Sequence, residues 1–79
     1  MKTHELKILP QYFEEVWDGN KNFELRKDDR NYKVGDSLRL LEFDYGTYTG
    51  RECNREIKYI LRNADQYGLK DGFVIIAIK

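Results

Sequence analysis

Residues 19–26, GNKNFELR, mark the point at which a helix ends and a strand begins. Gly19 favours the left-handed conformation that commonly closes a helix, and it lets the chain reverse. After the turn, apolar and charged residues alternate with the period of two that is typical of a β-strand. Glu24 and Arg26 therefore project from one face of that strand, and Lys21 lies in the turn just before it. The stretch predicts a helix-to-strand turn that gathers three charges of mixed sign.

Upstream of this turn, the sequence predicts one strand and one helix. Residues 3–9 alternate between polar and apolar side chains, as a half-buried strand does. Pro10 stops the strand and suits the first position of a helix, where its missing N–H has no partner in any case. The helix is expected over residues 10–18. One face of it is apolar and is interpreted as core-facing: Tyr12, Phe13, Val16 and Trp17.

Downstream, four further strands are expected, over residues 22–28, 37–44, 51–62 and 73–78. Polar or glycine-rich turns separate them, including a hairpin tip over residues 45–50. On the fourth strand, Cys53, Ile57, Tyr59 and Leu61 share one parity. The last strand is almost wholly apolar, which predicts burial on both faces. The order β-α-β-β-β-β indicates an α+β, mainly β fold over residues 1–79, with hairpins that form a small closed or nearly closed barrel.

Composition limits the classes of function. The chain has 79 residues, the size of one domain, and its 14 basic residues balance 14 acidic ones. A protein that binds nucleic acid over much of its surface is usually strongly basic. Because this chain is neutral, any nucleic acid is expected to bind in a local pocket. One Cys and one His cannot supply the usual zinc ligands, and we expect no metal and no cofactor. No apolar run suits a signal peptide or a membrane span, so we expect a cytoplasmic protein without a membrane partner. We also expect a monomer.

The charges of the central stretch have two interpretations from spacing alone. Lys21 and Arg26 are suited to hold a phosphate, while Glu24 accepts from a base amino group or fixes Arg26. The same spacing is typical of an ion-pair ladder on an outward strand face, which contributes only ~0–1 kcal/mol. The residues themselves leave both interpretations open.

The pattern GxKxxExR, which residues 19–26 match, resembles the signature of the ASCH domains, a branch of the PUA-like β-barrels. The first strand, the Pro10 helix, residues 24–30, the turn 34–36 and the hairpin 48–51 also look like a small ASCH-like group of bacteria and phages. The resemblance covers nearly the whole chain. It implies a pseudo-β-barrel of five to six strands with one short N-terminal helix, and a cleft beside that helix that binds RNA. The signature residues carried over to this cleft are Gly19, Lys21, Glu24 and Arg26.

Four neighbouring residues extend the expected site. Lys7 lies on the first strand with parity opposite to its apolar residues, and Lys27 and Arg30 closely follow the signature. Tyr48, at the hairpin tip, is suited either to stack on a base or to pack across the hairpin. The sequence therefore favours a non-catalytic domain that binds RNA or a nucleotide.

Two other functions stay open. Some compact ASCH proteins are amidohydrolases that act on acylated cytosine nucleosides, and Lys21 matches their lysine. Glu24 stands where that group has a threonine nucleophile, which counts against the same chemistry. If the chain is an enzyme, Glu24 would activate water and Lys21 would hold the developing oxyanion. The second alternative is an accessory module that interacts with another protein.

Overall fold

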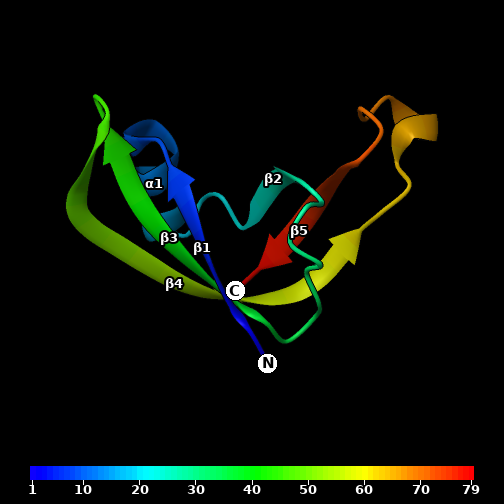
Figure 1. Cartoon of the computed structure of the whole chain (residues 1–79), viewed down its shortest axis with the longest axis horizontal. Coiled ribbons are helices and arrows are strands. Elements are labelled where there is room, and N and C mark those ends of the chain that lie inside the picture. Colours follow the sequence, from blue (N-terminus) through cyan, green and yellow to red (C-terminus); the bar gives the residue numbers. More distant parts are fainter.

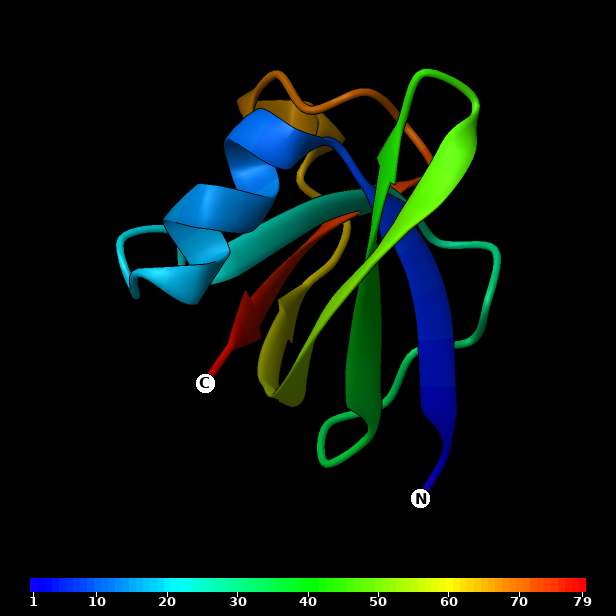
Figure 2. The ribbon, with the colours of Figure 1, turned by 90° about the vertical axis from the view of Figure 1, so that its left-hand side faces the viewer.

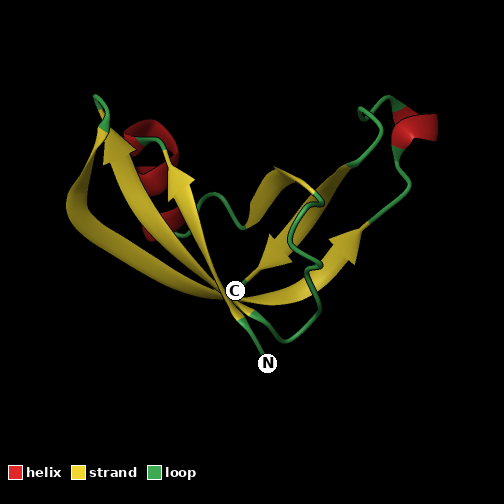
Figure 3. Cartoon of the chain, viewed as in Figure 1, coloured by secondary structure: helices red, strands yellow, loops and turns green.

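The computed structural model describes all residues, 1–79, and its main feature is one bent five-stranded sheet with a single short helix (Figure 1). The strands are β1 (Thr3–Ile8), β2 (Phe23–Lys27), β3 (Ser37–Asp44), β4 (Thr47–Leu61) and β5 (Phe73–Ile78). The helix is α1 (Pro10–Trp17), and a 3-10 turn, η1, covers Asp65–Tyr67. Strands dominate the chain (Figure 3), which confirms the predicted mainly β, α+β class.

The sheet has the strand order β1-β3-β4-β5-β2. β1 runs parallel to β3, and every other neighbouring pair is antiparallel. The 15-residue strand β4 runs through both limbs of the bent sheet and joins them (Figure 1). No backbone ladder joins the edge strands β1 and β2. The sheet is therefore open along the seam between these two edges, whereas the sequence suggested a closed or nearly closed barrel.

Two arginine side chains bridge this seam. Arg26 Nη2 donates to the Lys7 carbonyl oxygen at 2.8 Å, and Arg30 Nη1 donates to the Glu5 carbonyl oxygen at 2.7 Å. In a parallel strand the backbone N–H and C=O groups of alternate residues point to opposite edges. Those of Glu5 and Lys7 lie at the edge of β1 that has no neighbouring strand. Because an open edge invites pairing with another chain, the two guanidinium groups also blunt this edge.

The hydrophobic core fills the inner face of the bent sheet beneath α1. Every second residue of β3 and β5 is buried, so β5 alternates between buried and half-buried side chains and is not buried fully on both faces. On β4, Cys53 and Ile57 are buried, but a register shift between Ile57 and Tyr59 moves the buried position to Ile60. Tyr59 is exposed, so the single parity predicted for this strand holds only as far as the bulge.

The helix α1 begins at Pro10 and presents a narrow apolar face. Phe13 and Val16 are buried, but Tyr12 and Trp17 are about half exposed. The interpretation of Trp17 as a core residue is wrong, because a two-turn helix turns only one narrow stripe toward the sheet. The Trp17 ring instead stacks on Phe13, with 5.9 Å between the ring centroids.

Gly19 ends the helix as predicted, with a φ of +79°. Its N–H donates to the Val16 carbonyl oxygen, and the N–H groups of Asn20 and Lys21 both donate to that of Glu15. These bonds satisfy the last carbonyls of α1 and turn the chain into β2 (Figure 2). No helix of the chain is long and apolar enough to cross a membrane.

Candidate functional site

A cleft of about 580 Å³ lies between the end of β1, α1 and β2. We call it the aromatic cleft. Its apolar walls are formed by Ile8, Leu9, Tyr12, Phe23 and Leu25. Its charged groups are Lys7, Glu15, Lys21, Glu24 and Arg26. The volume and the mixture of apolar walls with few charged groups are typical of sites for small ligands.

Glu24 is the buried anchor of this cleft, with 3% of its surface exposed. Its Oε1 accepts a hydrogen bond from Lys21 Nζ at 2.8 Å, and its Oε2 accepts one from Arg26 Nε at 3.1 Å. Phe23 and Leu25, on the opposite face of β2, are about half exposed. The charged face of β2 therefore points inward, which contradicts the ion-pair ladder on an outward face.

Lys21 is fixed between two aromatic rings. Besides Glu24, its Nζ donates to the Phe23 carbonyl oxygen at 2.7 Å. The same nitrogen lies 4.9 Å from the centre of the Phe23 ring and 5.8 Å from that of Tyr12. An ammonium group has three hydrogens to donate, and two are used. The third has no partner in the protein and is available to an anionic ligand.

Arg26 is held through two of its guanidinium nitrogens. Nε and Nη2 both lie within hydrogen-bond distance of Glu24 Oε2, at 3.1 and 3.0 Å, and Nη2 also donates to the Lys7 carbonyl oxygen, while Nη1 has no partner in the protein. Its side chain is 24% exposed, so part of the group faces solvent. Two cations share one carboxylate here, which leaves a net charge of one positive unit whose donors are held in place by the fold.

A second groove of about 540 Å³ adjoins the aromatic cleft, and we call it the β1 groove. The two hollows share Lys7 and Arg26, and the β1 groove adds Arg30 and Tyr48. Lys7 Nζ lies 4.4 Å from the centre of the Phe43 ring and 5.9 Å from that of Tyr48. The expected site residues Lys7, Arg30 and Tyr48 are thus brought together with Arg26, and of these Arg30 and Tyr48 lie outside the aromatic cleft.

Two expected site residues line neither hollow. Gly19 closes the helix and so places Lys21; a side chain there would meet no atom within 4 Å, so its positive φ is what requires glycine. Lys27 is exposed at the end of β2, on the strand face opposite to Arg26. Sequence reasoning missed Tyr12 and Phe23 as cleft residues, because both belong to apolar patterns that it assigned to the core.

The second buried glutamate, Glu42, has a structural role. It accepts hydrogen bonds from Thr49 Oγ1 at 2.6 Å and from Arg51 Nε at 3.0 Å, and these bonds, first that of Arg51, lower the pKa of Glu42. Arg51 also pairs with Glu14 of α1 and covers the Phe13 ring at 4.7 Å. This cluster fastens the helix to the β3–β4 hairpin and lines neither hollow.

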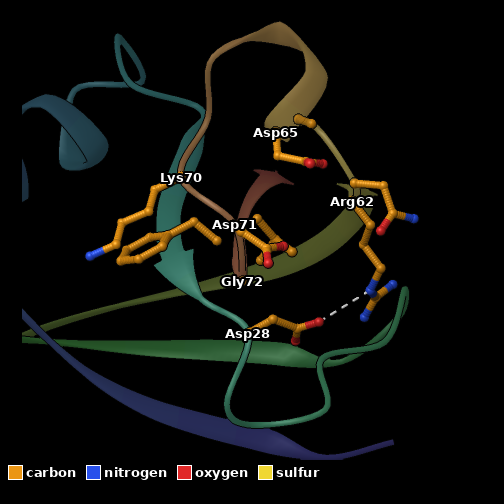
Figure 4. Close-up of a pocket in the computed structure, with 10 residues that line it drawn as sticks. Asp28, Arg62, Asp65, Lys70, Asp71 and Gly72 are labelled. Carbon is orange, nitrogen blue, oxygen red and sulfur yellow. Dashed lines mark hydrogen bonds and ion pairs between the residues drawn. The ribbon is translucent and has the colours of Figure 1, made fainter.

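A third hollow, of about 110 Å³, lies at the other end of the sheet between β4, η1 and β5. Figure 4 shows that Asp28 and Arg62 form an ion pair across it, 3.3 Å long, while Lys70 extends away from that pair. The hollow is too small for a nucleotide, and two further aspartates, Asp65 and Asp71, make it unsuited to an anion. No group of three or more His, Cys, Asp or Glu residues is arranged to hold a metal ion.

Comparison with known proteins gives a family and a phage relative. A family model described as "Domain of unknown function (DUF3850)" matches residues 3–78. The "Uncharacterized 12.9 kDa protein in GpA 3'region" of Escherichia phage P2 is 46% identical over 56 residues, which are 71% of this chain and 51% of that protein. The chain thus aligns with about half the length of this curated relative. Both hollows are built from residues within the span that the family model matches.

Proposed function

This chain belongs to the family DUF3850, a domain of unknown function, and we propose that it binds RNA or a nucleotide in the aromatic cleft. The observation that carries the proposal is the buried Glu24 carboxylate, which holds Lys21 and Arg26 in a cleft with aromatic walls. A buried charge is costly unless its partners are fixed around it. The chain thus maintains two oriented cations beside exposed rings.

The cleft offers a nucleotide two kinds of contact. The unpaired hydrogens of Lys21 and Arg26 are suited to bind a phosphate with charge-assisted hydrogen bonds. Tyr12 and Phe23 are each about half exposed and supply flat apolar surface on which a base stacks, at ~1–3 kcal/mol per base. A neutral protein that binds through a local site fits this arrangement.

Glu24 acts in this proposal as a positioning residue. Both of its oxygens are engaged by cations and its side chain is 4% exposed, so it orients the phosphate-binding groups and does not contact the base. Of the two roles expected from the sequence, fixing Arg26 is therefore favoured over reading an exocyclic amine. The similarity of residues 19–26 to the ASCH signature also supports the proposal. We propose that the DUF3850 family and the ASCH domains are related.

Calorimetric titration with AMP, GMP, CMP and UMP tests the proposal. Lys21→Gln and Arg26→Gln are expected to weaken binding at least fivefold, because each removes one phosphate-binding group. The matched control is Arg55→Gln, since Arg55 also donates to a backbone carbonyl oxygen, that of Val16, but lies outside both hollows.

Equal affinities for the wild type and both cleft variants would reject the proposal. A parallel incubation with N4-acetylcytidine, followed by NMR, reports free acetate. Release of acetate that depends on Lys21 would replace binding with hydrolysis as the function of the cleft.

A further inference from the structure

The aromatic cleft and the β1 groove adjoin each other, because Lys7 and Arg26 line both. A single nucleotide occupies the first and leaves the second empty. We infer that the ligand is a single-stranded oligonucleotide of at least two nucleotides, which runs along the free edge of β1 from the aromatic cleft to Tyr48. This inference rests on the proposed function and specifies its ligand class.

The spacing of two guanidinium groups supports this path. Arg26 is anchored on the carbonyl oxygen of Lys7 and Arg30 on that of Glu5. These carbonyls are two residues apart on one extended strand, hence about 6.6 Å. That separation is comparable with the distance between successive phosphates of an extended nucleic-acid strand. Arg26 keeps Nη1 free of protein partners, and Arg30 keeps Nε and Nη2 free, so each arginine retains a donor for one phosphate.

The charge of the β1 groove is suited to a polyanion. Lys7 forms no ion pair with any carboxylate, and its ammonium group lies against the Phe43 ring. Arg30 also has no carboxylate partner. The one carboxylate in the groove, Glu5, pairs with Arg39, which also pairs with Glu52. Three cations, Lys7, Arg26 and Arg30, therefore line the groove against one carboxylate.

Tyr48 provides the second stacking surface. Its ring is fixed edge-on against Phe43, with 5.0 Å between centroids and an interplanar angle of 78°. Even so, 53% of Tyr48 remains exposed. A ring that is immobilised and exposed loses little entropy when a base stacks on it. The first base would thus lie against Tyr12 and Phe23 and the next against Tyr48.

The test compares AMP and UMP with the 5′-phosphorylated dinucleotides pApA and pUpU by calorimetric titration. The dinucleotides are expected to bind the wild type at least tenfold more tightly than the mononucleotides. In Arg30→Gln and in Tyr48→Ala this ratio is expected to fall to about two, whereas Arg55→Gln retains it. Deoxyribose dinucleotides in a parallel series report whether the 2′-hydroxyl is recognised.

Three results would overturn the inference in different ways. Tight mononucleotide binding without a gain for dinucleotides rejects it and leaves the proposed function standing. A gain that survives both Arg30→Gln and Tyr48→Ala rejects the path along β1. Absence of binding for all these ligands at millimolar concentration rejects the proposed function and the inference together. The ratio of dinucleotide to mononucleotide affinity is measured on the wild type alone. The first and third results can therefore be obtained even if a variant fails to fold.

Discussion

Glu24→Gln is the most informative single substitution, because it removes one charge and almost no volume. The Glu24 carboxylate accepts charge-assisted bonds from Lys21 and Arg26. Bonds of this kind contribute ~1.5–3 kcal/mol each when charged groups take part. Glutamine keeps one acceptor oxygen, and the two cations are 16% and 24% exposed, so water replaces part of the loss. We expect the free energy of unfolding to fall by about 2 kcal/mol.

The effect of this substitution on ligand binding separates two physical explanations. Loss of the carboxylate makes the cleft more positive by one unit, which by Coulomb attraction alone would strengthen phosphate binding. If Glu24 instead orients Lys21 and Arg26, their donors spread over several rotamers in the variant and binding weakens. The positioning role predicts nucleotide affinity about tenfold lower, or about 1.4 kcal/mol.

Urea denaturation followed by circular dichroism measures stability, and calorimetric titration with nucleoside monophosphates measures affinity. Glu56→Gln is the matched control, because Glu56 is a carboxylate on β4 whose contact with Lys79 Nζ is 3.8 Å long and whose side chain is 53% exposed. An exposed pair contributes at most about 1 kcal/mol. If Glu24→Gln is as stable as Glu56→Gln, or binds nucleotides more tightly than the wild type, the positioning role is refuted.

Further predictions concern acid stability, the buried thiol and salt dependence. Hydrogen bonds from His4 and from two backbone N–H groups lower the pKa of Asp36 from 3.8 to about 2. The ionised Asp36 therefore contributes about 2 kcal/mol to the free energy of unfolding above pH 4, and this contribution is lost as the pH falls from about 4 to 2. Urea titrations are expected to show a smaller loss of stability over this pH range for Asp36→Asn than for the wild type. Burial raises the pKa of the Cys53 thiol, so a thiol reagent is expected to label it only after urea unfolding; rapid labelling of the native chain would contradict this. For a longer single-stranded RNA, Arg30→Gln should reduce the slope of log affinity against log salt by about 0.7, and an unchanged slope would exclude a phosphate contact there.

Local signals were sufficient for most of the fold. Pro10 and Gly19 mark the two ends of α1, because one lacks an N–H and the other tolerates a positive φ. Alternation located β1, β2 and β4, flanking turns located β3, and an apolar run located β5; β3 and β5 agree with their expected bounds. At the hairpin the turn is reduced to Tyr45 and Gly46, so β4 begins four residues earlier than Arg51.

Features that depend on tertiary contacts were not predictable. Alternation defines two faces of β2 but does not say which one is buried, and here the charged face is inside because Lys21 and Arg26 neutralise Glu24. The bulge after Ile57 moves the buried side of β4 by one residue, and no local sequence signal marks it. The seam is another example, since the contact of Arg30 with Glu5 requires β1 and β2 to be neighbours in space.

The sequence predicted the charged residues of the candidate site but not the aromatic residues that line it. Lys21, Glu24 and Arg26 meet because a tight turn and a strand period of two place them together, and both are local properties. Tyr12 and Phe23 line the same cleft only because an eight-residue helix and an edge strand leave them half exposed. Burial of aromatic residues on short elements is decided by their neighbours, which sequence patterns do not report.

A two-dimensional amide NMR titration with nucleoside monophosphates tests the central claim most directly. The account predicts that the largest shifts occur at Tyr12, Lys21, Phe23 and Arg26, with saturation below millimolar concentration. The hollow beside Arg62 serves as an internal control, and its amides are expected to stay unchanged. Shifts confined to that hollow, or none in the aromatic cleft at millimolar ligand, would contradict the assignment of the Glu24 cleft as a nucleotide site.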